Sequence, residues 1–277
     1  MATNLIGEFL RARREQISPH DAGIAVNGHR RVPGLRRDEL AMLAGISTEY
    51  YTRLEQGRDR RPSAQVLDAV ARALHLDPEA TAHLHGLADP AVPRRRLNRR
   101  PNRPTERVRP GIVRLIESWP QPAYIEGRYL DVLAANRLAT LVAPVFVPGV
   151  NMLRAVLLDP RLRDVREDDV ARMIAMLRGA VGADVDDPRL IELVGELSVK
   201  SEVFRRIWAR HEVRPHPGSG LYRIEHPQVG PIELEYEKFA VTGAEDQTMV
   251  VYHVEPGSRS AEALSLLGML DAPQSRS

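Results

Sequence analysis

Residues 36–63 read RRDELAMLAGISTEYYTRLEQGRDRRPS, and this stretch decides how the first part of the chain folds. Apolar residues recur in it with helical spacing as far as Ile46, and Gly45 interrupts the run. Ser47 is a good N-cap for a second short helix, which Gly57 ends. The pattern therefore predicts two short helices joined by a tight turn, as in a helix-turn-helix.

The second of these helices has the side chains that a DNA-reading helix needs. Tyr51 and Leu54 are three residues apart and face inward, while polar residues on the opposite face suit base edges and phosphates. A solvated helical hairpin has the same period, but it does not require the small, turn, capping and apolar positions to coincide. We predict that duplex DNA is bound by Arg36, Arg37, Ser47, Thr48, Glu49, Thr52, Arg53, Gln56 and Arg58.

Residues 5–88 resemble the XRE (xenobiotic response element) family of Cro/C1-type helix-turn-helix domains. The matching strings are LRARRE at 10–15, GHRRVPGLRRDELAMLAGIS at 28–47, YYTRLEQGR at 50–58 and PSAQVLDAVARAL at 62–74. The resemblance implies an all-α domain of five helices with residues 48–56 in the major groove. It implies that the residues nearest to base edges are Thr48, Glu49 and Arg53, and that those nearest to phosphates are Arg37, Ser47 and Gln56.

Composition narrows the class of protein. The chain has 277 residues, of which 43% are hydrophobic, so it is long enough for two globular domains with substantial cores. It contains no cysteine, which excludes disulfides, thiolate zinc sites and cysteine nucleophiles. No stretch has the pattern of a signal peptide or a membrane span, so we expect a cytoplasmic protein without a membrane partner.

Positive charge is concentrated in the front of the chain. Residues 1–108 carry 19 Arg against 13 Asp and Glu, a net +6, whereas the rest carries 20 Lys and Arg against 24 Asp and Glu, a net −4. This division is expected if only the front part meets a polyanion.

A stretch rich in proline and arginine separates two predicted domains. Residues 91–110 cannot form a packed element, and we interpret them as a linker between a domain over 1–90 and a domain over 111–277. Six arginines lie within residues 94–103. The linker is therefore either a solvated spacer or an arm that follows DNA phosphates.

The last part of the chain has the mixed pattern of an α+β domain. A hairpin is predicted from strands over 123–125 and 129–133, followed by a helix over 134–142. Later strands are predicted near 232–236, where apolar and acidic residues alternate, and over 248–254. Helices are predicted over 168–181, 187–199, 201–211 and 261–270.

Residues 119–270 resemble the MmyB-like ligand-binding domain found behind this XRE subtype. The matching strings are PAYIEGRYLDVLAANRLA at 122–139, NMLRAVLLDPRLRD at 151–164, MLRG at 176–179, ELSVKSEVFRRIWARHEV at 196–213 and HPQVGPIELEYEKF at 226–239. The resemblance implies a PAS-like sensor, in which a small sheet backed by helices surrounds an apolar cavity. It also implies a small apolar ligand, such as a fatty acid.

Nine residues of this domain are candidates for contact with such a ligand. Eight of them sit at helix or strand spacing, so ordinary core packing is the simpler explanation for each, and Asn136 is expected to cap or fix a local turn. The candidates are Tyr124, Val132, Leu133, Asn136, Met173, Met176, Leu177, Phe204 and Trp208.

The chain shows no pattern of catalytic chemistry. Neither a nucleophile elbow, a phosphate loop nor a set of metal ligands on one helix face is present in the sequence, so we expect neither an enzyme nor a cofactor. The leading hypothesis is a one-component transcription regulator that binds a near-palindromic operator as a homodimer. A DNA-bound dimer whose last domain is only an oligomerisation or protein-interaction platform is the alternative, and a DNA-tethered enzyme is the third reading.

Overall fold

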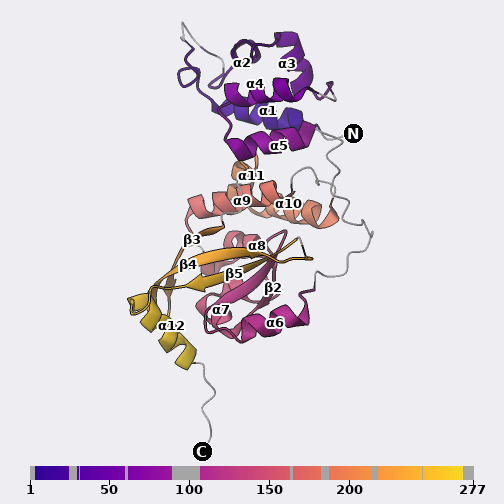
Figure 1. The fold of residues 1–277 in the computed structure, drawn as a ribbon. Coiled ribbons are helices and arrows are strands. Elements are labelled where there is room, and N and C mark those ends of the chain that lie inside the picture. Colours follow the sequence, from indigo (N-terminus) through magenta and orange to yellow (C-terminus); the bar gives the residue numbers. More distant parts are fainter. Residues whose placement is uncertain are drawn as a thin grey trace, which may run out of the picture. The chain divides into compact units, whose positions relative to one another are not determined.

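The computed structural model divides the chain into two compact units (Figure 1). One consists of Met1–Asn98 and Glu167–Pro215, and the other of Arg99–Arg166 and His216–Ser277. Within them, the structure describes residues 4–24, 30, 32–59, 62–88, 107–162, 165–181, 187–213, 218–244 and 246–270. Most of the predicted linker over 91–110, including the six arginines within residues 94–103, lies outside the described residues.

The first unit is helical. Its N-terminal helices are α1 (Leu5–Gln16), α2 (Arg37–Ala44), α3 (Thr48–Glu55), α4 (Ala64–Ala73) and α5 (Pro78–Ala88). Three helices from the middle of the chain complete it, namely α9 (Glu167–Val181), α10 (Pro188–Lys200) and α11 (Glu202–Trp208). The core of the N-terminal helices is built from large apolar side chains such as Phe9, Leu40, Tyr51, Leu54 and Leu84.

Local sequence rules account for the ends of α2, α3 and α4. Gly45 ends α2 with φ of 67°, a left-handed conformation that suits glycine. The hydroxyl of Ser47 accepts a hydrogen bond from the Tyr50 amide at 3.1 Å, and Ser63 caps α4 in the same way through Val66. The predicted caps and turn are therefore confirmed.

The second unit is a mixed α+β domain. Its sheet has the order β2-β1-β5-β4-β3, and every pair of neighbouring strands is antiparallel. The strands are β1 (Ala123–Gly127), β2 (Val132–Ala135), β3 (Ser219–His226), β4 (Gly230–Ala240) and β5 (Gln247–His253). The other elements are α6 (Pro110–Glu117), α7 (Arg137–Val142), the 3-10 turn η1 (Pro144–Phe146), α8 (Met152–Leu158), the 3-10 turn η2 (Pro160–Leu162) and α12 (Arg259–Leu270).

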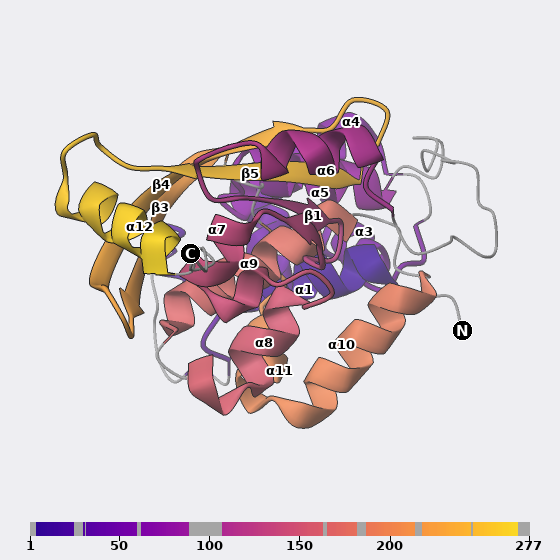
Figure 2. The same ribbon diagram turned by 90° about the horizontal axis from the view of Figure 1, so that it is seen from below.

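The two faces of this sheet have different partners. Ile125 of β1 and Ala134 of β2 form a small core with Ile116 of α6, which lies along this part of the sheet in both views (Figures 1 and 2). Tyr124 points to the other face, because side chains alternate along a strand. Helix α12 lies beside β4, as Figure 2 shows.

The sequence analysis missed several elements and misplaced the boundaries of the first hairpin and of the helix that follows it. Helices α6 and α8, strand β3 and the 3-10 turns η1 and η2 were not predicted. The strand predicted over 129–133 begins only at Val132, and the helix predicted from Ala134 begins only at Arg137. Ala134 and Ala135 belong to β2, because Asn136 between them and the helix has extended backbone angles and acts as the N-cap of α7.

The buried Asn136 side chain connects α7, β1 and α6 through hydrogen bonds. Its Oδ1 accepts hydrogen bonds from the amides of Ala139 at 3.0 Å and Ala123 at 3.1 Å. Its Nδ2 donates to the carbonyls of Gln121 at 2.7 Å and Ile116 at 3.1 Å. The side chain is only 3% exposed, so its own polar atoms need these partners, and it satisfies the amides of Ala123 and Ala139 in return.

We predict that Asn136→Ala destabilises the protein by about 2–4 kcal/mol, because it removes a helix cap and leaves buried backbone groups unpaired. Urea unfolding followed by circular dichroism measures this change. Thr140→Ala on the same helix is the control and should change stability by less than about 0.5 kcal/mol. Equal effects of the two substitutions would show that the Asn136 contacts do not stabilise the fold.

Candidate nucleic-acid interface

Helix α3 presents a polar face to solvent and an apolar face to the core. Tyr51 and Leu54 are fully buried, as the spacing predicted. Thr52 is partly buried. The predicted DNA-binding residues that are exposed are Arg36, Arg37, Ser47, Thr48, Glu49, Arg53, Gln56 and Arg58. The structure thus brings together on α3 and at its two ends a set of hydrogen-bonding and cationic groups without large apolar side chains.

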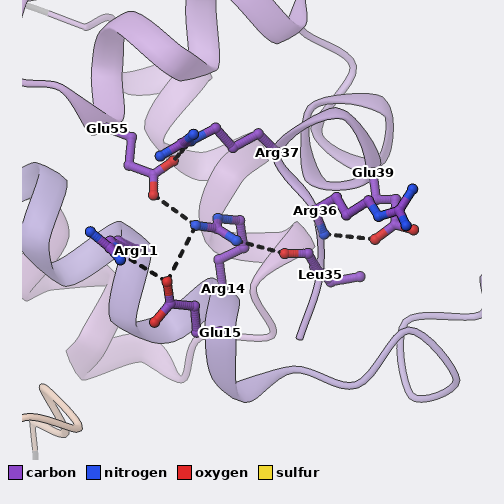
Figure 3. A network of polar contacts seen from close by, with 8 residues as sticks. All are labelled: Arg11, Arg14, Glu15, Leu35, Arg36, Arg37, Glu39 and Glu55. Atoms are coloured by element: carbon purple, nitrogen blue, oxygen red, sulfur yellow. Dashed lines mark hydrogen bonds and ion pairs between the residues drawn. The ribbon is translucent and has the colours of Figure 1, made fainter. Parts of the chain in front are cut away.

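A buried ionic network lies directly behind this face (Figure 3). Glu55, the last residue of α3, has a side chain that is 2% exposed. Its Oε1 accepts a hydrogen bond from Nη2 of Arg14 on α1 at 2.8 Å, and its Oε2 accepts one from Nε of Arg37 on α2 at 2.7 Å. Arg14 also donates through Nη1 to the carbonyl of Leu35 at 2.7 Å. One carboxylate therefore joins the first three helices.

This network positions Arg37, one of the predicted phosphate-binding residues. The Arg37 side chain is 46% exposed, whereas that of Arg14 is 8% exposed. Glu55 occupies the Nε side of the Arg37 guanidinium, and the remaining N–H groups of its fork are suited to a phosphate oxygen. The sequence analysis missed Glu55 because an acidic residue next to a DNA-reading helix does not by itself suggest a binding role.

A second ion pair fixes the start of α2. The backbone amide of Arg36 donates to Oε2 of Glu39 at 2.7 Å (Figure 3), and Arg30 binds both carboxylate oxygens of Glu39 at 2.7 Å. The Arg30 guanidinium lowers the pKa of Glu39 below its ordinary value. The loop that precedes α2 is thereby tied to its first turn, where Arg36 is exposed.

Arg53 is held on the outer face of α3 by a neighbouring ring. Its guanidinium carbon lies 5.5 Å from the centroid of the Tyr50 ring, within the range of a cation–π contact. This contact keeps the charged group extended from the helix and limits the conformational freedom that binding would remove.

The predicted ligand-contact residues are divided between the two units. Tyr124, Val132, Leu133 and Asn136 lie in the second unit, on or next to β1 and β2. Those in the first unit, on α9 and α11, are Met173, Met176, Leu177, Phe204 and Trp208. Neither unit by itself contains the whole predicted set.

Within the second unit, Tyr124 belongs to an aromatic cluster. Its ring stacks on Phe146 of η1 at 4.8 Å between centroids and lies 6.1 Å from the ring of Tyr252. Tyr222 and Tyr236 join the cluster through Tyr252 at 5.8 and 5.9 Å. Burial raises the pKa of both Tyr124 and Tyr252, so these phenols remain neutral hydrogen-bonding groups.

A buried ion pair borders this aromatic cluster. Lys238 Nζ lies 2.7 Å from Glu126 Oε1, and the hydroxyl of Tyr124 donates to Glu126 Oε2 at 3.4 Å. The sequence analysis missed Glu126, Lys238 and four of the five rings. The alternating pattern along β4 indicates that Tyr236 and Lys238 lie on the same face of that strand. The sequence did not show that β3 and β5 bring further rings to this face.

Two short capped helices around a glycine turn, with an exposed polar face, define a helix-turn-helix protein, a class that binds DNA. A family model described as a helix-turn-helix domain matches residues 5–84, and one described as an MmyB-like transcription regulator ligand binding domain matches residues 108–267. The second match covers more than half of the chain. The chain therefore belongs to the transcription regulators with an MmyB-like ligand-binding domain. No curated protein matches it.

We predict that Glu55→Ala lowers the stability of the protein by about 3–5 kcal/mol, because it leaves the Arg14 guanidinium buried without its carboxylate. Urea unfolding of the full chain measures the loss. Asp169→Ala, which breaks the exposed pair with Arg172 on α9, is the control and should cost less than about 0.5 kcal/mol. A loss for Glu55→Ala as small as that of the control would contradict a structural role for the network.

Proposed function

We propose that this protein is a one-component, cytoplasmic transcription regulator of the XRE type, in which helices α1–α5 form a five-helix DNA-binding domain. The observation that carries the proposal is the exposed polar face of α3 beside Arg37, whose guanidinium is oriented by the buried Glu55. In this reading α3 enters the major groove, Thr48, Glu49 and Arg53 read base edges, and Arg37, Ser47 and Gln56 bind phosphates. In the described part of the chain, no helix is long and apolar enough to cross a bilayer.

The proposed DNA-bound form is a homodimer on a near-palindromic site, since two-fold proteins match two half-sites about one helical turn apart. The exposed apolar side chains of α12 support a second copy as partner, because Leu266, Met269 and Leu270 are 48%, 72% and 57% exposed.

The DNA-binding proposal is tested with duplexes selected by the full chain from a random-sequence library. Fluorescence anisotropy should show an affinity that falls steeply with salt, and Arg37→Ala should reduce the log–log salt slope by about one. Arg53→Ala should change the selected sequence, because base contacts carry specificity. A titration above the dissociation constant should give two chains per duplex.

Arg172→Ala, on α9, is the matched control for Arg37→Ala because it also removes one positive charge. It should leave the salt slope unchanged. If both variants change the slope equally, Arg37 does not contact a phosphate. If the wild-type affinity does not depend on salt, the DNA-binding proposal is wrong.

We further propose that the second unit belongs to a PAS-like sensor for a small, mostly apolar ligand of the fatty-acid class. The aromatic cluster of Tyr124, Phe146, Tyr222, Tyr236 and Tyr252 supports this, because it joins broad apolar rings to phenolic hydroxyls on one face of the sheet. Lys238, which pairs with Glu126 beside these rings, is a cation that a ligand carboxylate would share with that residue. A bound ligand changes DNA affinity only as far as its own affinity differs between two conformations.

We predict that the full chain co-purifies with a small apolar acid that is released on denaturation and detected by comparing native and denaturing mass spectra. Phe146→Ala should lower its occupancy, because it opens the aromatic cluster. Phe239→Ala is the control, since Phe239 is 48% exposed on β4. An empty wild-type dimer, or equal occupancy in both variants, would favour a domain that serves only as an oligomerisation platform.

A further inference from the structure

Arg178 of α9 is a partly buried cation in the first unit. Its guanidinium carbon lies 3.8 Å from the centroid of the Trp208 ring, and its Nη2 donates to the Trp208 carbonyl at 2.7 Å. Burial lowers the pKa of Arg178 to about 10, and the group is therefore still charged at neutral pH. The protein thus places a positive charge in a poorly solvated position.

Arg178 has no carboxylate partner among the described residues. The nearest acidic influence on its pKa comes from Glu8 of α1, whose side chain is exposed to solvent. A buried charge without a counterion is unfavourable, and the neutral contacts to Trp208 offset this only in part. The arrangement therefore favours the binding of an anion next to the Arg178 guanidinium.

Two histidines beside Arg178 are kept neutral. Nη1 of Arg178 lies 3.3 Å from Nδ1 of His211, so that ring nitrogen accepts and must be unprotonated. Burial, followed by the charge of Arg178, lowers the pKa of His211 to about 4, and the same causes lower the pKa of His83 to about 4. At neutral pH, Arg178 is therefore the charged group of these three residues.

These groups line a small, partly open cavity. Its volume is about 40 Å³, and its walls include Arg178, His83, His211, Phe9, Leu190 and Trp208. One water needs roughly 10–15 Å³ of such space, so the cavity holds several waters or a small organic molecule. The Phe9 ring meets the His83 ring edge-on at 5.3 Å, which gives this side of the cavity an apolar surface.

We propose that this cavity binds a small aliphatic carboxylate, whose oxygens pair with Arg178 while its alkyl group lies against Phe9 and Leu190. A single cation matches a monoanion, and the apolar walls favour an alkyl group over a fully hydrated inorganic ion. The cavity walls come from α1 and α5, within the helix-turn-helix match, and from α9–α11, within the MmyB-like match. A bound carboxylate therefore links these two regions of the chain, and its binding does not depend on the proposed DNA contacts.

The test uses the full chain with Trp119→Phe, so that Trp208 is the remaining tryptophan. Sodium acetate, propionate and butyrate are titrated against sodium chloride at constant ionic strength while Trp208 fluorescence is recorded. We expect a saturable change with a carboxylate and none with chloride. Arg178→Gln should weaken binding roughly tenfold or more, because it removes the charge-assisted pair. Arg172→Gln on the same helix should not.

A second variant tests the same proposal if Arg178→Gln does not fold. Leu190→Phe fills the cavity, so it should abolish the carboxylate response while the protein remains folded. The melting temperature of the wild type should also rise with the carboxylate more than with chloride, because a ligand stabilises the folded state that binds it. No saturable response, an equal response to chloride, or full binding by Leu190→Phe would overturn the proposal.

Discussion

The buried carboxylate of Glu55 is the constraint on which the DNA-facing part of the molecule depends. It accepts hydrogen bonds from Arg14 and Arg37, and so joins α3 to α1 and α2 (Figure 3). In a poorly solvated position such charged hydrogen bonds are strong, and the loss of one partner is costly. The angle between the two helices of the motif and the direction of Arg37 are thus determined by the same group.

In the second unit, the corresponding constraint is strand pairing between distant parts of the chain. Strand β1 pairs with β5, although more than a hundred residues separate them in the sequence. The register places Tyr124 opposite Val250 and Tyr236 opposite Tyr252, so the rings of three strands gather on one face. The aromatic surface therefore exists only when the sheet is complete.

Local patterns predicted the elements whose ends carry a clear chemical signal. Ser47 and Ser63 begin helices and Gly45 ends one, as their side chains or lack of one require. Strand β3 was missed because Gly220 is unfavourable in a strand. The structure explains this glycine, since a Cβ atom there would lie 2.5 Å from the Tyr236 hydroxyl of the neighbouring strand. The strand propensity of a residue depends on its own type, and it does not account for a contact with a residue that is distant in the sequence.

The sequence by itself determined the helix-turn-helix, the polar face of α3 and the mixed α+β character of the later part, because these follow from periodicity, capping and composition over short stretches. Only the tertiary structure decided that Glu55 orients Arg37, that five rings share one face of the sheet, and that Arg178 packs against Trp208. Each of these depends on residues far apart in the chain. Their contacts are set by packing and by the loss of water around charged groups, which no local pattern records.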